Sequence, residues 1–190
     1  MKSTILGLMA VFALGTISSQ AAVTYNFGNQ AATFDGNVST IVALVDGATN
    51  FNMSVAAVGG NLNSNATSFG VDDSAIDGTS ESITISFSTD ILFNAIDFSS
   101  IGADITDGAS FTIGGSTTNL FTGATDFSGG FDIYTPSSAI ALTAGDTILL
   151  TGSSATSSYD LDIINVTAVP EPSTALLGAL GALAFLRRRR

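Results

Sequence analysis

The side chains of this sequence best suited to chemistry are carboxylates. Four of them lie within ten residues of one another, and two more alternate along a later apolar segment. Groups of carboxylate oxygens are the ligands that Ca²⁺ prefers, and the carboxylates of a chain without internal cations repel one another until a divalent ion relieves them. The candidate calcium ligands are Asp72, Asp73, Asp77, Glu81, Asp160 and Asp162.

The group does not form an EF-hand, and one alternative to a calcium site is open. Asp73, Asp77 and Gly78 match part of an EF-hand loop, but Ala75 occupies its third position and Thr84 its twelfth, so that pattern fails. Aspartate is also common in turns, where it forms local hydrogen bonds, so these residues could simply be solubilising turn residues.

The composition excludes most other site chemistry. The chain has 5 basic and 16 acidic residues and a net charge of −11, and its middle, residues 22–169, has no Lys, Arg or His. Without a base no serine nucleophile is activated, and without Cys or His no zinc site is expected. Nucleic acid is excluded as a partner, because phosphate binding needs basic residues. Glycoside hydrolysis by two carboxyl groups remains, with Glu81 the only glutamate before residue 171.

The hydrophobic pattern of the middle region predicts strands. Ile83, Ile85 and Phe87 alternate with polar residues, and similar short runs are separated by turn signals such as Asp77-Gly78. The predicted strands are 23–27, 39–45, 51–58, 82–88, 91–98, 110–113, 119–121, 131–134, 147–151 and 161–169. We therefore expect a single all-β domain at 22–169, a β-sandwich of jelly-roll type. A β-solenoid is the alternative, but the sequence has no fixed-period repeat.

The first residues have the pattern of a secretory signal peptide. Lys2 precedes an apolar stretch at 5–17, and the small residues Ser19 and Ala21 follow it. This arrangement predicts a signal helix over residues 1–21 with cleavage after Ala21. The alternative is an ordinary buried helix.

The last residues combine a polar motif, an apolar segment and a basic cluster. Pro170, Glu171 and Pro172 precede a predicted transmembrane helix at 174–186. That helix would be about 20 Å long against a hydrocarbon core of about 30 Å, which suits a temporary anchor. A plain tail anchor is the alternative. The basic residues that would stay in the cytoplasm are Arg187, Arg188, Arg189 and Arg190.

Residues 169–190 resemble the PEP-CTERM sorting signal, which has these three parts in this order. The segment 70–87 and the closing 159–169 resemble, more loosely, elements of PEP-CTERM ectodomains. The resemblance implies that export machinery and a membrane-embedded exosortase process the chain. It also implies a Gram-negative host, an inner-membrane intermediate, and a final location in the envelope, at the surface or in the extracellular matrix.

The sequence thus predicts a non-enzymatic structural or adhesive protein, with Ca²⁺ as a contributing ion. A module that binds extracellular polysaccharide is the alternative. Trp is absent, so exposed aromatic contacts to sugar would have to come from Tyr25, Tyr134 and Tyr159. A carboxylate glycosidase is the third hypothesis.

Overall fold

The protein is built from β-strands. The computed structural model describes residues 21–47, 49–73, 75–98, 109–113, 116–119, 127–128, 133–152, 155 and 158–170. In these ranges the one helix is α1 (Ala31–Phe34), a single turn. No helix among the described residues is long and apolar enough to cross a bilayer. The predicted signal helix, except Ala21, and the predicted transmembrane helix at 174–186 lie outside the described residues.

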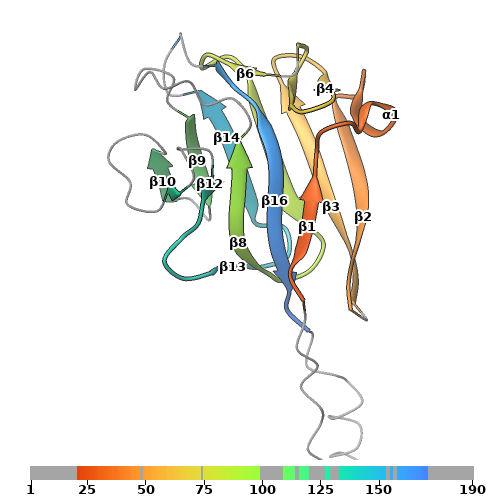
Figure 1. Cartoon of the computed structure of the whole chain (residues 1–190), viewed down its shortest axis with the longest axis vertical. Helices are drawn as coiled ribbons and strands as arrows, with labels where there is room; N and C mark the ends of the chain where they lie inside the picture. Colours follow the sequence, from red (N-terminus) through yellow and green to blue (C-terminus); the bar gives the residue numbers. More distant parts are fainter. Residues whose placement is uncertain are drawn as a thin grey trace, which may run out of the picture.

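The strands form two large antiparallel sheets and one small one (Figure 1). The larger sheet has the order β11-β12-β8-β16-β5-β4, with β1 also paired to β16 and β13 to β8. Its strands are β1 (Val23–Asn26), β4 (Leu62–Ser64), β5 (Phe69–Val71), β8 (Ile91–Phe98), β11 (Phe127–Ser128), β12 (Ile133–Tyr134), β13 (Ile140–Leu142) and β16 (Leu161–Ala168).

The second sheet has six strands in the order β10-β9-β14-β7-β3-β2. Its strands are β2 (Ser39–Asp46), β3 (Thr49–Val58), β7 (Ser82–Phe87), β9 (Ala109–Ile113), β10 (Ser116–Asn119) and β14 (Thr147–Gly152). The small sheet pairs β6 (Ile76–Asp77) with β15 (Ser158–Tyr159).

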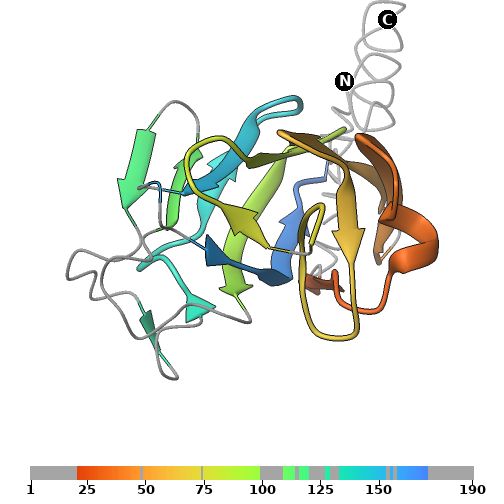
Figure 2. The same ribbon diagram turned by 90° about the horizontal axis from the view of Figure 1, so that it is seen from above.

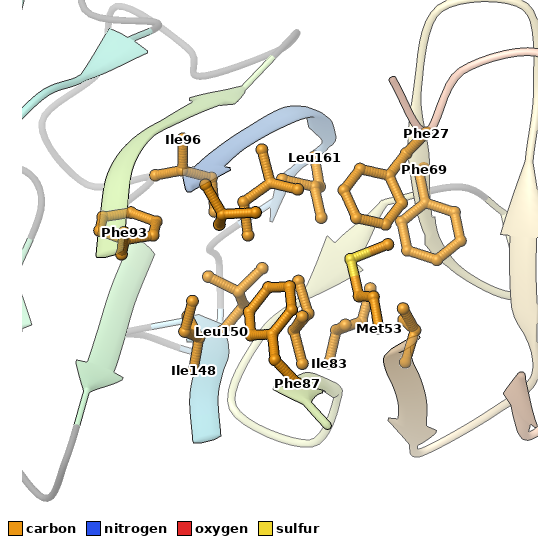
Figure 3. Packing of buried hydrophobic residues seen from close by; sticks show 14 of the residues in the cluster. Phe27, Met53, Phe69, Ile83, Phe87, Phe93, Ile96, Ile148, Leu150 and Leu161 are labelled. Atoms are coloured by element: carbon orange, nitrogen blue, oxygen red, sulfur yellow. The ribbon is translucent and has the colours of Figure 1, made fainter. Parts of the chain in front are cut away.

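The hydrophobic core lies between the two large sheets (Figure 3). One layer of side chains comes from the larger sheet and includes Phe93, Ile96 and Leu161, and the facing layer comes from the six-stranded sheet. Ile83 and Ile85, which the alternating pattern placed on one face of β7, are fully buried there. Burial of one face of each sheet is what stabilises an antiparallel sandwich.

Three phenylalanines close one side of the core beside α1. Phe27, Phe34 and Phe69 are each fully buried, and the Phe69 ring centroid lies 4.9 Å from that of Phe27 and 4.5 Å from that of Phe34. We call these three residues the aromatic corner. Seen from above, α1 covers the side of the molecule next to β2 (Figure 2), where it also contacts β4.

The predicted all-β class and the long strands are confirmed. The bounds of β8 agree with the prediction, and those of β2, β7, β14 and β16 differ by one residue, because long alternating runs leave little freedom of register. The short strands β4, β5, β6, β11, β13 and β15 and the helix α1 were not predicted. Of the predicted strand at 119–121 only Asn119 is described, as the last residue of β10, and the rest lies outside the described residues. The jelly-roll connectivity stays a prediction.

The first and last strands lie side by side. β1 pairs antiparallel with β16, with Val23 opposite Val166, so the domain begins and ends at the same end of the sandwich (Figure 1). β16 has eight residues and spans about 25 Å at about 3.3 Å per residue. Its other end, at Leu161, lies beside β5 and the small sheet.

Candidate functional site

The segments that carry the predicted metal ligands lie at the end of the sandwich away from the start of β1 and the end of β16, which we call the acidic end (Figure 1). Asp72 follows β5 in the left-handed backbone region, with φ 50°. Its Oδ1 accepts a hydrogen bond from the Asn61 amide at 2.8 Å, and its own amide donates to the Asn61 carbonyl at 2.7 Å. The Asp72 carboxylate therefore fastens the β5–β6 turn to the preceding loop.

Asp73 and Asp77 lie on the two sides of this turn. Asp73 Oδ1 accepts a hydrogen bond from the Ala75 amide at 3.3 Å, which is a local turn contact. The Asp77 amide donates to Glu81 Oε2 at 2.9 Å, so the glutamate folds back over the loop that precedes β7. Asp77 Oδ1 is buried and has no hydrogen-bond partner among the residues that the structure describes.

The small sheet brings Asp160, one acid of the second predicted group, to the first group. Pairing of β15 with β6 puts Tyr159 opposite Ile76 and Ser158 opposite Asp77, so Asp160 follows directly beside the turn. Burial raises the pKa of Asp160 to about 6, and the charges of Asp73 and Asp77 add to the effect. The sequence left open whether the two groups meet, and the fold brings Asp160 to the turn.

The remaining two acids differ in their surroundings. The pKa of Glu81 is raised first by burial and then by the charges of Asp77, Asp73 and Asp72, while the hydrogen bond from the Asp77 amide lowers it. Burial alone raises the pKa of Asp162, near the start of β16. Within the described ranges no three carboxylates are grouped so as to hold a metal ion. Calcium binding stays a prediction that rests on the accumulated charge.

The raised pKa of Asp160 predicts a pH-dependent stability. A carboxyl with a pKa of about 6 when folded and about 3.9 when unfolded stabilises the fold below pH 4, and that contribution is lost as the pH rises through 6. Because Asp160 is only half-buried, solvent screening reduces the effect to about 1 kcal/mol. We expect the free energy of unfolding in a calcium-free buffer to decrease by this amount between pH 4.5 and 7.

The matched variants for this titration are Asp160→Asn and Asp146→Asn. Asp160→Asn is expected to flatten the slope between pH 4.5 and 7. Hydrogen bonds from Thr143 lower the pKa of Asp146, so its own titration falls below this window and its variant is expected to keep the slope. Urea unfolding at each pH measures the effect, and stability in the wild type that rises from pH 4.5 to 7 would contradict it.

At the opposite end of the sandwich, a buried carboxylate is bonded to the end of the last strand. Asp46, the last residue of β2, is 1% exposed, and its Oδ2 accepts a hydrogen bond from the Ala168 amide at 2.9 Å. The Val169 amide donates to the Asp90 carbonyl at 2.8 Å. Pro170, which has no amide proton, is the first exposed residue after β16. Only Val169 therefore separates β16 from Pro170.

Two polar features were missed by the sequence analysis. The sequence indicates that Asp46, before Gly47, is an ordinary turn residue, and only the fold shows that it is buried. The second feature is a row of amide and hydroxyl groups on the outer face of the larger sheet. Asn94 Nδ2 donates to Asn165 Oδ1 and to Thr167 Oγ1, each at 3.0 Å, and Asn165 Nδ2 donates to Thr24 Oγ1 at 2.9 Å. The alternation of polar residues along 161–168 was the available signal.

The residues predicted to direct processing are only partly described. Ala21, at the predicted signal cleavage site, and Pro170 are described. Ala21 lies just before β1 and Pro170 just after β16, two strands that pair with Val23 opposite Val166. The other predicted residues of this group lie outside the described ranges, and they are Glu171, Pro172, Arg187, Arg188, Arg189 and Arg190.

Comparison with known families identifies the C-terminal segment. The PEP-CTERM protein-sorting motif matches residues 168–190. No characterised protein and no solved structure matches the chain. The motif indicates export, membrane-associated sorting toward the cell envelope and exosortase as the general type of processing partner. Its first residue, Ala168, is the one bonded to Asp46. This chain therefore carries a C-terminal PEP-CTERM protein-sorting motif, which begins at the last residue of its last strand.

Proposed function

We propose that this protein is an acidic, non-enzymatic β-sandwich of the Gram-negative cell surface or extracellular matrix. Removal of the C-terminal tail by exosortase releases it from the inner membrane, and its role is structural or adhesive. The observation that carries the proposal is the sorting motif at residues 168–190. The lack of Lys, Arg, His and Cys in residues 22–169 supports a non-enzymatic role, because the usual nucleophile–base pairs are missing.

The position of the motif in the fold supports an oriented presentation of the domain. β16 runs from the acidic end to Ala168, where the motif begins. While the tail is in the membrane, the Ala168 end would face the bilayer and the acidic end would point away from it. The carboxylates at the acidic end are then available to bridge, through Ca²⁺, to other anionic surface molecules.

The proposal predicts the termini of the mature protein. We expect the matrix form to begin at Ala22 and to end between Pro170 and Ser173, because signal peptidase and exosortase each remove one end. Intact-mass measurement of the native protein from membrane and matrix fractions tests this, and any excess mass reports glycosylation. Replacing Pro170, Glu171 and Pro172 together with alanine is expected to keep the full tail and to leave the protein in the membrane fraction.

A proline outside the motif provides the matched control. Pro136→Ala changes a surface loop and is expected to leave processing and location as in the wild type. A wild-type membrane form that still ends at Arg190, with none in the matrix, would overturn tail removal. The protein would then be a membrane-tethered surface domain.

Calcium is expected to stabilise the protein through the acidic end. With 10 mM Ca²⁺ and a dissociation constant of about 1 mM, as in weak extracellular sites, binding adds about 1.4 kcal/mol to the free energy of unfolding. For a domain of this size, Tm then rises by about 3–5 °C. The double variant Asp73→Asn, Asp160→Asn is expected to lose the shift, and Asp146→Asn to retain it. No calorimetric heat with calcium and an unchanged Tm after chelation would exclude the ion.

Polysaccharide binding is the second candidate function, and the polar row on the larger sheet favours it. The side chains of Asn94, Asn165 and Thr167 present amide and hydroxyl groups, which suit the hydroxyls of a sugar chain. The tyrosines do not favour it, because Tyr134 and Tyr159 are buried. A polysaccharide pull-down that fails with Asn94→Ala but not with Asp146→Asn would promote this function over the structural one. The carboxylate glycosidase ranks third, supported only by the raised pKa of Asp160 and Glu81.

A further inference from the structure

We propose that Asp46 is the binding site for the protein's own N-terminal ammonium group, which exists only after signal peptidase has cut before Ala22. This inference rests on the export step of the proposed function. It makes one buried carboxylate the contact point for both processed ends of the chain, the new N-terminus and the start of the sorting motif. The pair would form during maturation, since the precursor has an uncharged peptide bond at that place.

The state of the Asp46 carboxylate is the first observation. The residue is 1% exposed, and Oδ2 accepts the Ala168 amide proton at 2.9 Å. Oδ1 is buried and has no hydrogen-bond partner among the described residues. A buried carboxylate oxygen without a partner is costly, and such groups are normally paired with a cation or with several donors. Asp46 therefore has one remaining position for a donor.

The position of Ala22 is the second observation. Val23 lies opposite Val166 in the β1–β16 pair, so extending the register by one residue puts Ala22 beside Thr167, next to Ala168. β1 also lies beside β2, the strand that ends at Asp46 (Figure 1). Ala22 is exposed and precedes the first residue of β1, so it lies outside the paired part of the strand. The register thus places the new ammonium group opposite the residue that precedes Ala168, whose amide donates to Asp46.

No side chain of the domain offers another positively charged group. Residues 22–169 have no Lys, Arg or His, so the α-ammonium is the only positive charge of the mature domain. The other described acids at this end already accept hydrogen bonds, Asp90 from the Ala144 amide and Asp146 from Thr143. Both of these are exposed turn contacts, and an ion pair at such a place is worth little. Asp46 is the buried partner, and a buried pair is screened much less.

The protein itself supplies a clean test, because removal of residues 1–21 also removes Lys2, the only lysine. The α-amine is then the only primary amine, whether or not the tail is retained. Reductive methylation of the exported protein with ¹³C-formaldehyde labels that nitrogen alone, as the dimethylamine, and keeps its positive charge. Following the ¹³C signal with pH measures its pKa, which is about 7.7–8.0 for a free α-amine.

We expect the α-amine pKa to be raised by at least one unit in the wild type, a tenfold or larger increase in proton affinity. Asp46→Asn keeps the acceptor for Ala168 but removes the charge, and it is expected to return the pKa to about 8. Asp90→Asn is the matched control and is expected to keep the raised value. If Asp46→Asn does not fold, one alanine inserted before Ala22 moves the ammonium by one residue and is expected to have the same effect.

If the α-amine titrates near pH 8 in the wild type, as in Asp46→Asn or in the variant with the inserted alanine, the proposed ion pair is overturned. A mature chain that starts elsewhere than Ala22, found by N-terminal sequencing, would also overturn it and would leave sorting through the C-terminal motif untouched. The α-amine pKa could also be raised in a protein that still carries residues 171–190. The pair would then stand, and tail removal would fall.

Discussion

Replacing Phe69 with alanine is expected to lower the free energy of unfolding by about 3–5 kcal/mol, because it deletes the central ring of the aromatic corner. Phe69 is fully buried and is in ring contact with Phe27 and Phe34. Its removal leaves a cavity between β5, α1 and the end of β1, and these elements are fixed by their own hydrogen bonds and relax only in part. For a domain of this size the loss corresponds to a fall in Tm of about 10 °C.

Thermal unfolding of the exported protein measures the effect. Phe69→Leu keeps most of the volume and is expected to cost less than about 1.5 kcal/mol. Ile41→Ala is the surface control: Ile41 is 69% exposed, and its truncation is expected to change stability by about 0.5 kcal/mol or less. A change below about 1 kcal/mol in Phe69→Ala would mean that the aromatic corner is not part of the cooperative core.

The burial of the long strands could be predicted from the sequence, but the burial of the aromatic corner could not. Ile83, Ile85 and Phe87 were assigned to one buried face because a strand alternates its side chains, and this local rule has one outcome when the run is long. Phe34 and Phe69 lie in segments of three or four residues, which are too short for a period to show. Their burial depends on contacts between segments far apart in the sequence.

The candidate site shows the same division. The clustering of Asp72, Asp73 and Asp77 is visible in the sequence, but their meeting with Asp160 requires the pairing of β6 with β15, two strands of two residues each. The burial of Asp46 was beyond prediction as well, because its carboxylate is bonded to the amide of Ala168, which lies 122 residues away in the sequence. The sorting motif was readable because its function depends on a short contiguous segment.

Replacing Gly70 with alanine is expected to disrupt the acidic end, at a cost in stability comparable to the lower value expected for Phe69→Ala. A Cβ atom at Gly70 would lie 2.3–2.4 Å from the carbonyl oxygen, carbonyl carbon and amide nitrogen of Ala75. These are backbone atoms, and the Val71 amide donates a hydrogen bond to the same Ala75 carbonyl at 2.7 Å. The neighbour cannot rotate away as a side chain would, so the β5–β6 turn must open. We expect the free energy of unfolding to fall by about 3 kcal/mol, at the upper end of the effects of overpacking.

Gly145→Ala separates this clash from ordinary backbone strain. Gly145 has φ +87°, and no atom lies within 4 Å of the place that a Cβ would take, so its variant is expected to cost about 1–2 kcal/mol, from the left-handed backbone alone. The two variants also differ at the acidic end. Opening the β5–β6 turn moves Asp72 and Asp73 away from Asp160, so Gly70→Ala is expected to abolish the calcium shift in Tm, whereas Gly145→Ala keeps it. A Gly70→Ala protein with wild-type stability and an intact calcium response would show that the close approach to Ala75 does not position these carboxylates.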